Sequence, residues 1–241
     1  MVPINFRKFL FGALLLAGVA LFTGQAWATF FIPINNFSFE SPASTNAGTS
    51  CSTTAIPGWT CSSPTNEGVY VPTSTNFHVG SNGLTGSLIV PDGNQAAFMN
   101  RNSGTTVGLT SQLTASTVSS DKTYKLSAWV GTPVGSNSGN STLQLLATNN
   151  ANVTTVIATQ SFTNPAAGQW TLETLTFHVA AGNPLIGQKI SVGLLGNTQG
   201  NSAINWDDVI LVPEPPILLL LAMGFGALAF ARRKKQKISL T

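Results

Sequence analysis

The chain has 241 residues, of which only 8% are charged, and a formal net charge of +3. Seven of its eleven basic residues lie near the two ends, whereas the stretch 29–212 holds four basic and seven acidic residues, a formal charge of −3. This mildly acidic central part lacks the basic patch that binds a phosphate backbone, so we expect no nucleic acid among the partners.

The N-terminus has the three-part pattern of a secretory signal peptide. Arg7 and Lys8 precede an apolar run over 9–22, and Ala-Trp-Ala at 26–28 is a small-x-small cleavage site. The pattern predicts a signal peptide over residues 1–28 and export by the Sec machinery. An uncleaved anchor helix is the alternative.

The stretch 29–211 is predicted to be a β domain. It is rich in Ser, Thr, Asn and Gly, and its apolar residues fall in short segments between Gly-, Pro- and Asn-rich turns. Residues 124–131 alternate apolar and polar side chains, as in a strand with one buried face, and no segment shows a helical period. We therefore expect an all-β domain, an antiparallel β-sandwich or jelly roll, with long connections over 43–93. A disordered stalk is the alternative that this alternation disfavours. The expected strands are Asn36–Glu40, Gln95–Asn100, Leu109–Leu113, Tyr124–Gly131, Ser141–Thr148, Thr154–Phe162, Trp170–Val179, Lys189–Leu195 and Asn205–Val212.

Two cysteines, Cys51 and Cys61, occur in the chain. Outside the cytoplasm such a close pair is most simply a disulfide that closes a small loop. The loop-entropy model gives roughly 2–3 kcal/mol for a bridge of this length. A metal site would need further ligands nearby, and a redox pair would need the Cys-x-x-Cys spacing. Neither is present, so free thiols are the remaining alternative.

The C-terminal end has the composition of a targeting segment. Pro-Glu-Pro at 213–215 precedes an uncharged apolar run over 217–231 and a basic cluster over 232–235. As a helix the run would span roughly 22 Å, somewhat less than the roughly 30 Å of hydrocarbon in a bilayer. The basic cluster would lie on the cytoplasmic side by the positive-inside rule. We expect a transmembrane helix over 217–231 that acts as a temporary tether; a permanent tail anchor and a buried core helix are the alternatives.

Val212, Pro213, Glu214 and Pro215, with the apolar run and basic cluster that follow, resemble the PEP-CTERM sorting signal over residues 212–237. The resemblance implies cleavage at this motif by an exosortase. It also implies an inner-membrane precursor and a mature protein at the cell surface or in the extracellular matrix of a Gram-negative bacterium. The expected partners are therefore the exosortase, the Sec machinery, the inner membrane transiently, and exopolysaccharide.

Three motifs in the central stretch resemble those of a galactose-binding-like jelly roll, the fold of many carbohydrate-binding modules. They are Asn-x-Ser-Phe-Glu at 36–40, Pro-Gly-Trp at 57–59 and Trp-Asp-Asp-Val at 206–209. Within this group the chain is similar to the Stig-type cyclases, which are calcium-containing jelly rolls. The resemblance implies this fold and a structural calcium ion, but its motifs say little about activity.

Acidic residues at both ends of the domain are the candidates for that calcium site. The first and last strands of such a sandwich lie side by side, so Glu40 could meet Asp207 or Asp208 at one edge. Calcium prefers six to eight oxygen ligands, which carboxylates and backbone carbonyls supply. Successive residues of a strand point to opposite faces, so only one of the two aspartates is expected to bind the ion. Solvent-facing acids at strand ends are the alternative.

No motif of a known catalytic centre occurs in the chain. It has no Gly-x-Ser-x-Gly elbow, no His-Glu-x-x-His and no phosphate loop, and His78 and His178 do not form a metal-binding pair. We therefore assign no catalytic residue and expect a non-catalytic binding or structural β-sandwich associated with exopolysaccharide. Tyr70 is the candidate ligand-binding residue, as an exposed platform for sugar stacking, whereas Trp59 and Trp129 are expected in the core.

The alternative function is that of a calcium-dependent, cyclase-like enzyme. One acid in an aromatic pocket could protonate an alkene, and aromatic rings could stabilise the cation that forms. A deep, dry, aromatic-lined pocket that holds one acid would distinguish such an enzyme from a binding module. The residues that supply the required types of side chain are Asp92, Asp121, Tyr70, Phe98 and Phe177.

Overall fold

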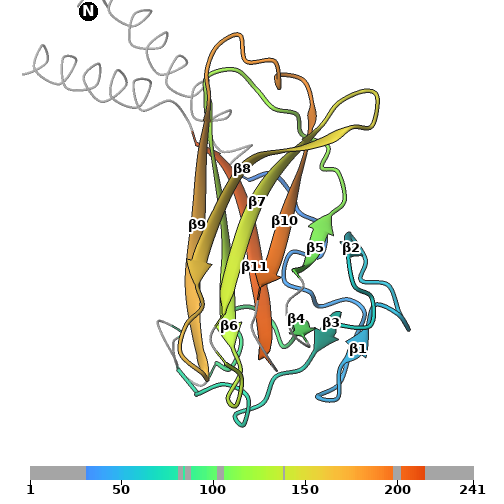
Figure 1. Ribbon diagram of the computed structural model, residues 1–241, viewed down its shortest axis with the longest axis vertical. Helices are drawn as coiled ribbons and strands as arrows, with labels where there is room; N and C mark the ends of the chain where they lie inside the picture. The colour runs from blue at the N-terminus through green and yellow to red at the C-terminus, as the bar shows by residue number, and fades with distance from the viewer. Residues whose placement is uncertain are drawn as a thin grey trace, which may run out of the picture. The chain divides into compact units, whose positions relative to one another are not determined.

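The fold is a sandwich of two antiparallel β-sheets (Figure 1). The computed structural model describes residues 31–80, 84, 88–101, 106–137, 139–197 and 202–214. Sheet A has the strand order β1-β3-β4-β11-β6-β9, and sheet B has the order β2-β5-β10-β7-β8. The prediction of an all-β antiparallel sandwich is confirmed. The strands are β1 (Thr49–Ser50), β2 (Trp59–Cys61), β3 (Glu67–Tyr70), β4 (Ala96–Arg101), β5 (Val107–Ser111), β6 (Lys122–Thr132), β7 (Asn140–Thr148), β8 (Thr154–Thr163), β9 (Gln169–Val179), β10 (Lys189–Asn197) and β11 (Ser202–Glu214).

Strand β6 illustrates how the sequence forms the main core. Tyr124, Leu126, Ala128 and Val130 are each at most 2% exposed and belong to the core between the sheets. Because successive strand residues point to opposite faces, this spacing gives β6 one fully apolar face toward sheet B. We call this side of sheet A its inner face. Each fully buried aliphatic side chain contributes roughly 1.5–3 kcal/mol through the hydrophobic effect.

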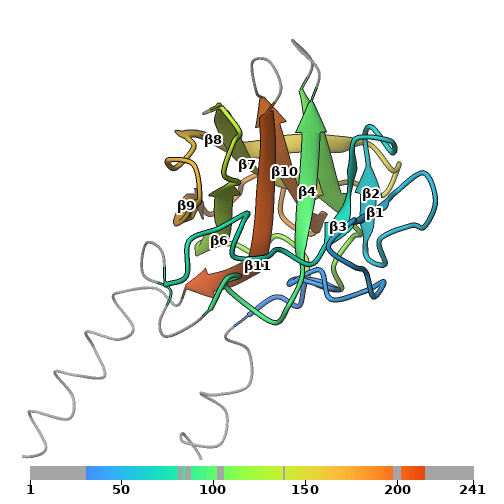
Figure 2. The same cartoon turned by 90° about the horizontal axis from the view of Figure 1, so that it is seen from below.

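Sheet A also has apolar side chains buried on its opposite, outer face. They belong to a second, smaller cluster that contains Trp170 of β9 and Phe77 of the β3–β4 connection (residues 71–95). The two rings stack with centroids 4.5 Å apart, and Trp170 Nε1 donates a hydrogen bond of 2.9 Å to the carbonyl of Ile89. The described parts of the β3–β4 connection therefore pack on the outer face of sheet A, in which strands β4, β11 and β6 lie side by side (Figure 2).

The expected first strand, Asn36–Glu40, is wrong. Asn36 and Phe39 have φ angles of 53° and 59°, and this left-handed conformation interrupts an extended strand. The Asn36 side chain holds the resulting turn, because its Oδ1 accepts a hydrogen bond of 3.0 Å from the amide of Ser41. The segment still lies beside the last strand, since the amide of Val209 donates a hydrogen bond of 3.0 Å to the carbonyl of Phe37.

Two other boundaries differ from expectation. The short strands β1, β2 and β3 lie within 43–93, where long connections but no strand were expected. At the other end, β11 pairs with β6 as far as Glu214, which lies opposite Thr123. Val212, Pro213 and Glu214 of the expected sorting motif are therefore part of the sheet rather than beyond its last strand.

The remaining targeting segments fall outside the described residues. These are the signal peptide over 1–28, Pro215, and the apolar run over 217–231 with its basic cluster. Among the residues that the structure does describe, no helix has the length and hydropathy needed to cross a bilayer.

Candidate functional site

A pocket of about 250 Å³ lies on the outer face of sheet A. Four of its lining side chains are asparagine amides, two are aromatic, and Tyr70 is the one titratable group among the lining residues that the structure describes. No charged side chain is among them. The pocket is therefore suited to an uncharged ligand that has an aromatic surface and hydrogen-bonding groups. The lining residues are Asn46, Ala47, Gly48, Tyr70, Asn76, Phe98, Asn100, Pro133, Ala203 and Asn205.

Strand register places Asn205 at the centre of the pocket floor. It lies opposite Phe98 of β4 on one side and opposite Gly131 of β6 on the other. Gly68 of β3 lies opposite Phe98, and Trp170 of β9 lies opposite Gly131. These five residues form a row across the outer face, with neighbouring strands about 4.8 Å apart.

Asn205 has an unsatisfied hydrogen-bond acceptor at this position. Its side chain is fully buried, and its Nδ2 donates a hydrogen bond of 3.0 Å to the carbonyl of Ala97. Its Oδ1 makes no hydrogen bond of normal geometry within the part of the chain that the structure describes. A buried acceptor without a partner costs roughly 1–3 kcal/mol. Among the described residues, Asn205 is the one with such an atom that also lines this pocket.

The sequence carries one signal for Asn205 that lies outside the recognised motifs. Asparagine is depleted in strands, yet this one stands between Ile204 and Trp206, both of which are fully buried on the inner face. A polar residue in the middle of a buried strand generally has a hydrogen-bonding role.

Tyr70 forms part of the pocket wall and is half-buried, not the exposed platform expected from the sequence. Its ring meets the ring of Phe98 edge to face, with centroids 6.0 Å apart. Burial raises the pKa of the Tyr70 hydroxyl well above its ordinary value, and a hydrogen bond with the Asn205 side chain partly opposes this rise. Tyr70 is therefore a neutral O–H donor throughout the physiological pH range.

Asp207 lies two residues beyond Asn205 and is also fully buried. Its Oδ2 accepts a hydrogen bond of 2.8 Å from the amide of Asp92, and its Oδ1 accepts one of 2.8 Å from the amide of Asp208. Burial raises the pKa of Asp207 well above its ordinary value, although both amide hydrogen bonds favour the carboxylate. This carboxyl is covered by the turn at Asp92 and is not among the groups that line the pocket.

Asp207 and Asp208 do not point to opposite faces as an unbroken strand would require. The pairing with β6 shifts register between Asp207 and Ile210, and Asp208 has a φ of 48°. Burial raises the pKa of Asp208, the charge of Asp92 adds to this rise, and the Trp129 indole N–H opposes it. The bulge therefore brings both aspartates near Asp92.

Glu40 reaches the same turn from the other end of the domain. Its Oε1 accepts hydrogen bonds of 2.9 Å from the amide of Asn94 and 2.8 Å from the amide of Gln95. The turn closes tightly on this carboxylate, because a Cβ at Gly93, which has a φ of 63°, would collide with Glu40. Carboxylates from both ends of the domain thus converge on residues 92–95.

The chemistry of this region fits a hard cation such as calcium. Its potential ligands are oxygen atoms, and the fully buried Asp207 has like charges nearby at Asp92 and Asp208. A buried carboxylate without a counter-charge is unfavourable, and a bound cation would relieve that cost. Within the described ranges, no group of three or more His, Cys, Asp and Glu side chains has the arrangement of a metal site. Backbone carbonyls would have to complete the shell.

The other residues considered from the sequence lie elsewhere. Asp121 is in an exposed turn with a φ of 54°, and Phe177 packs against the main core. His78 and His178 are both exposed, and His178 contacts Thr123 Oγ1 at 3.2 Å. Of the candidate residues for an aromatic pocket, the structure brings together only Tyr70 and Phe98.

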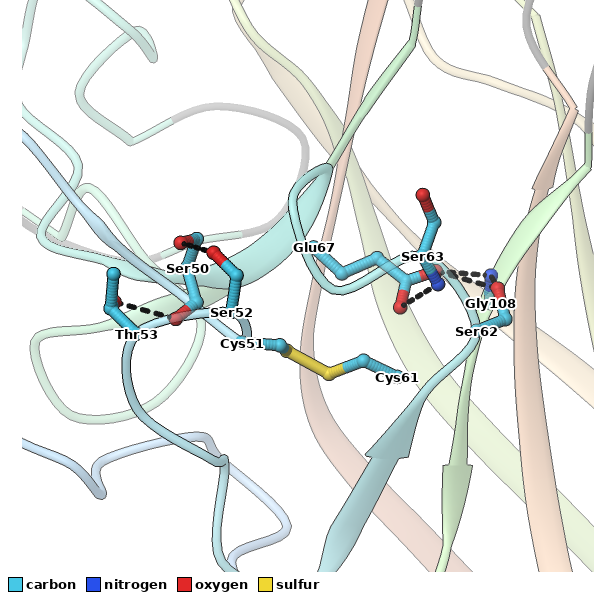
Figure 3. Close-up of a disulfide and its surroundings, with 9 residues drawn as sticks. All are labelled: Ser50, Cys51, Ser52, Thr53, Cys61, Ser62, Ser63, Glu67 and Gly108. Carbon is cyan, nitrogen blue, oxygen red and sulfur yellow. Dashed lines mark hydrogen bonds between the residues drawn. A yellow bond between two sulfur atoms is a disulfide. The ribbon is translucent and has the colours of Figure 1, made fainter.

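A disulfide and a buried acid hold the edge of the sandwich next to the pocket (Figure 3). Cys51, just after β1, is bonded to Cys61 at the end of β2, so the bridge joins sheet A to sheet B. The fully buried Glu67 of β3 accepts hydrogen bonds from Ser62 Oγ (2.9 Å), Ser63 N (3.1 Å) and Gly108 N (2.6 Å). Because its carboxylate has three donors, Glu67 has a structural role.

Solved structures with the same fold include cyclases from Fischerella sp. TAU. The Stig cyclase Fisc, in complex with (3Z)-3-(1-methyl-2-pyrrolidinylidene)-3H-indole, is 24% identical with a TM-score of 0.63, over 78% of this chain and 99% of that chain. A cyclase in complex with 4-(1H-indol-3-yl)butan-2-one is 24% identical with a TM-score of 0.61, over 77% of this chain and 98% of that chain. At this level of identity the likeness shows the fold. No curated protein matches the chain.

A protein-family model described as HpiC1-like, HpiC1 cyclase, matches residues 31–212. This match overturns the expectation of a non-catalytic binding or structural sandwich associated with exopolysaccharide, which rested on the absence of familiar catalytic motifs. It favours the alternative, a cyclase-type enzyme. The chain belongs to the HpiC1-like cyclase family.

Proposed function

We propose that the protein is a cyclase-type enzyme that closes a ring in a small, uncharged aromatic substrate bound over Asn205. The observation that carries the proposal is the buried, unpartnered Asn205 Oδ1 on the floor of a pocket walled by Tyr70 and Phe98. A ligand N–H or O–H would satisfy this acceptor, and the rings would contact its aromatic face.

Indole is the class of substrate that these features suit best. It is flat and uncharged, and it has one N–H donor for Asn205 Oδ1. The ligands named in the two Fischerella cyclase structures both contain an indole or 3H-indole ring. We therefore infer an indole-containing substrate with an alkene or similar electron-rich group on its side chain.

Tyr70 is the candidate proton donor, because it is the titratable group among the described lining residues. Its O–H would transfer a proton to the alkene carbon, and the ring π electrons would attack the resulting cation to form the new carbon–carbon bond. Loss of a proton from the cyclised cation to the tyrosinate would restore both partners. The reaction is an isomerisation and consumes no oxidant or reductant. Because the raised pKa makes Tyr70 a weak acid, the substrate must be electron-rich.

The test follows the cyclisation of an indole that carries a pendant alkene, with the purified full chain in D₂O. We expect a product in which one carbon-bound deuterium replaces a hydrogen, about one mass unit heavier than the substrate, with the alkene signals lost from the proton spectrum. Tyr70→Phe should lower the rate by 10²-fold or more, in line with removal of a general acid, and leave the Kd for 4-(1H-indol-3-yl)butan-2-one within about threefold. An unlabelled product, or full activity in Tyr70→Phe, would remove Tyr70 from the mechanism.

We also propose that Glu40 and one or both of Asp207 and Asp208 hold a calcium ion. The support is the convergence of Glu40 and Asp207 on residues 92–95, together with the resemblance to calcium-containing jelly rolls. When bound, the ion would supply a positive charge that stabilises these carboxylates. The residues themselves tie the N-terminal segment and the 92–95 turn to β11. Native mass spectrometry with and without chelator tests the proposal: an unchanged mass and an unchanged Tm would contradict it.

Finally, we propose that the enzyme acts outside the cytoplasm after export and exosortase processing. The support is the signal-peptide pattern over 1–28 and the PEP-CTERM resemblance over 212–237. Mass spectrometry of the protein recovered from its native host should find an N-terminus at Thr29 and a C-terminus near Pro213. Recovery of an intact 241-residue chain would contradict the proposal.

A further inference from the structure

Two glycines occupy positions in the row that contains Asn205, and each lies beneath an aromatic ring. Gly68 on β3 is approached by the carbonyl oxygen of Thr49 and covered by the ring of Phe98. A Cβ at Gly68 would collide with Thr49 O and would lie 2.7 Å from both Cε1 and Cζ of the ring. The Phe98 ring therefore lies over β3, and a side chain at position 68 would displace the β1 backbone as well as the ring.

Gly131 on β6 has the same relationship to a second pair of rings. A Cβ at Gly131 would lie 2.7 Å from Cε3 of Trp170 and 2.8 Å from Cε1 of Phe77. Such distances are shorter than any ordinary carbon–carbon contact, so the stacked pair of rings rests directly on the bare backbone of β6. No residue other than glycine leaves room for this arrangement.

The stacked pair in turn positions one wall of the pocket. Asn76, which lines the pocket, immediately precedes Phe77 in the chain. The carbonyl of Asn76 accepts a hydrogen bond of 2.8 Å from the amide of Val134, next to the lining residue Pro133. A shift of Phe77 off the sheet would therefore move the Asn76 side of the pocket.

We propose that Gly68 and Gly131 are specificity-determining residues, because together they set the width of the slot above Asn205. On one side of the slot, Gly68 leaves room for the Phe98 ring over β3. On the other side, Gly131 leaves room for the stacked rings of Trp170 and Phe77, which position Asn76. The inference rests on the proposed function, since it assigns selectivity to the same pocket. The slot accepts a flat ring system whose edge faces Asn205. Its width along that edge discriminates between a single ring and two fused rings.

The test compares indole, with two fused rings, and phenol, with one, as probes of ring width. Their Kd values are measured by calorimetry with the full chain and with Gly131→Ala, Trp170→Leu and the double variant. We expect Gly131→Ala to raise the Kd for indole by about tenfold. The Kd for phenol should rise by about threefold or less. In the Trp170→Leu background, the smaller side chain removes one of the two rings that meet the new methyl group and leaves space into which the ring of Phe77 can shift. Gly131→Ala should then change either Kd by less than about twofold.

Gly193→Ala on β10 is the matched control, a strand glycine in the other sheet whose nearest side chain is the flexible Gln144. It should leave both Kd values unchanged. A folded Gly131→Ala protein with wild-type Kd values would overturn the inference, as would a Gly131→Ala effect of equal size in the Trp170→Leu background. If Gly131→Ala does not fold, recovery of folding in the double variant supports the inference, and failure to recover overturns it. If the wild-type chain binds neither probe, the proposed function fails as well.

Discussion

The two faces of sheet A are built from the same strands but have opposite characters. On β11, the inner-face residues Ile204 and Trp206 are fully buried in the main core, while the outer-face residues Asn205 and Asp207 are fully buried and polar. The inner face meets sheet B, and the outer face meets the β3–β4 connection. Burial alone therefore does not separate structural from functional residues in this protein.

The difference reflects two requirements on one sheet, stability on its inner face and binding on its outer face. An apolar inner face maximises the area removed from water. The outer face keeps an unpartnered acceptor at Asn205 and a buried carboxyl at Asp207, both of which lower stability unless a ligand or cation compensates. Natural proteins accept such costs chiefly where function requires them.

Leu126→Ala should have the largest effect on stability. Leu126 is 1% exposed on the inner face of β6, and truncation of a buried leucine costs about 2–5 kcal/mol. The adjacent Ser127 faces the other side of the sheet, so Ser127→Ala should change the free energy of unfolding by less than about 0.5 kcal/mol. Chemical denaturation of both variants measures the contrast. Equal effects would mean that the inner face does not dominate stability.

Removing the bridge between the sheets should have the next largest effect. The Cys51→Ser/Cys61→Ser variant should lose about 3 kcal/mol by the loop-entropy model, measured by chemical denaturation. The nearby pocket wall should remain, because Thr49 of β1 still pairs with Val69 of β3. We therefore expect the affinity for indole to change by less than about threefold. A loss of affinity as large as the loss of stability would show that the outer face depends on this edge.

The acids near the outer face predict an unusual pH dependence. Burial raises the pKa of Asp207 and of Asp208, so the folded state holds these protons more tightly than the unfolded state. In chelator, stability should fall as the pH rises from about 4 toward the raised pKa values, by up to about 1.4 kcal/mol per pH unit for each proton involved. Most carboxylates that are hydrogen-bonded in native proteins produce the opposite trend.

Two controls accompany this measurement of Tm against pH. Asp207→Asn should flatten the slope, because it removes the more deeply buried acid. Added calcium should also flatten it, since a bound cation favours the carboxylate form. A slope that is the same in Asp207→Asn as in the wild type would assign the effect to other groups, such as Glu173, whose pKa is also raised by burial.

The inner face was predictable from the sequence, but the outer face was not. Alternation at 124–131 identified the buried side of β6, and eight of the expected strands, from β4 onward, have counterparts in the structure. The strand at 36–40 was wrong because the left-handed conformations of Asn36 and Phe39 depend on tertiary hydrogen bonds and packing. Propensity and periodicity do not register such local exceptions.

The pocket could not be predicted for a different reason. Its residues come from the segment before β1, from β3, β4 and β11, from the β3–β4 connection and from Pro133 just after β6, so only the strand order brings them together. The sequence makes Tyr70 and Phe98 candidates for an aromatic pocket. Their position next to Asn205 depends on the register of β3, β4 and β11. The absence of a familiar catalytic motif also led to the wrong expectation about function, because a general acid in a pocket needs no motif.

Asn205→Leu should change binding while causing the smallest change in stability of these variants. Leucine loses the hydrogen bond from Nδ2 to Ala97 but also removes the unpartnered Oδ1, so the two effects oppose each other. We expect the free energy of unfolding to change by about 1 kcal/mol or less, because replacing a poorly satisfied polar group with an apolar one of similar size is nearly neutral. Indole binding, by contrast, should weaken by at least about tenfold, as calorimetry would measure. A large loss of stability with unchanged binding would make Asn205 a structural residue, and the distinction between the two faces of sheet A would then no longer follow function.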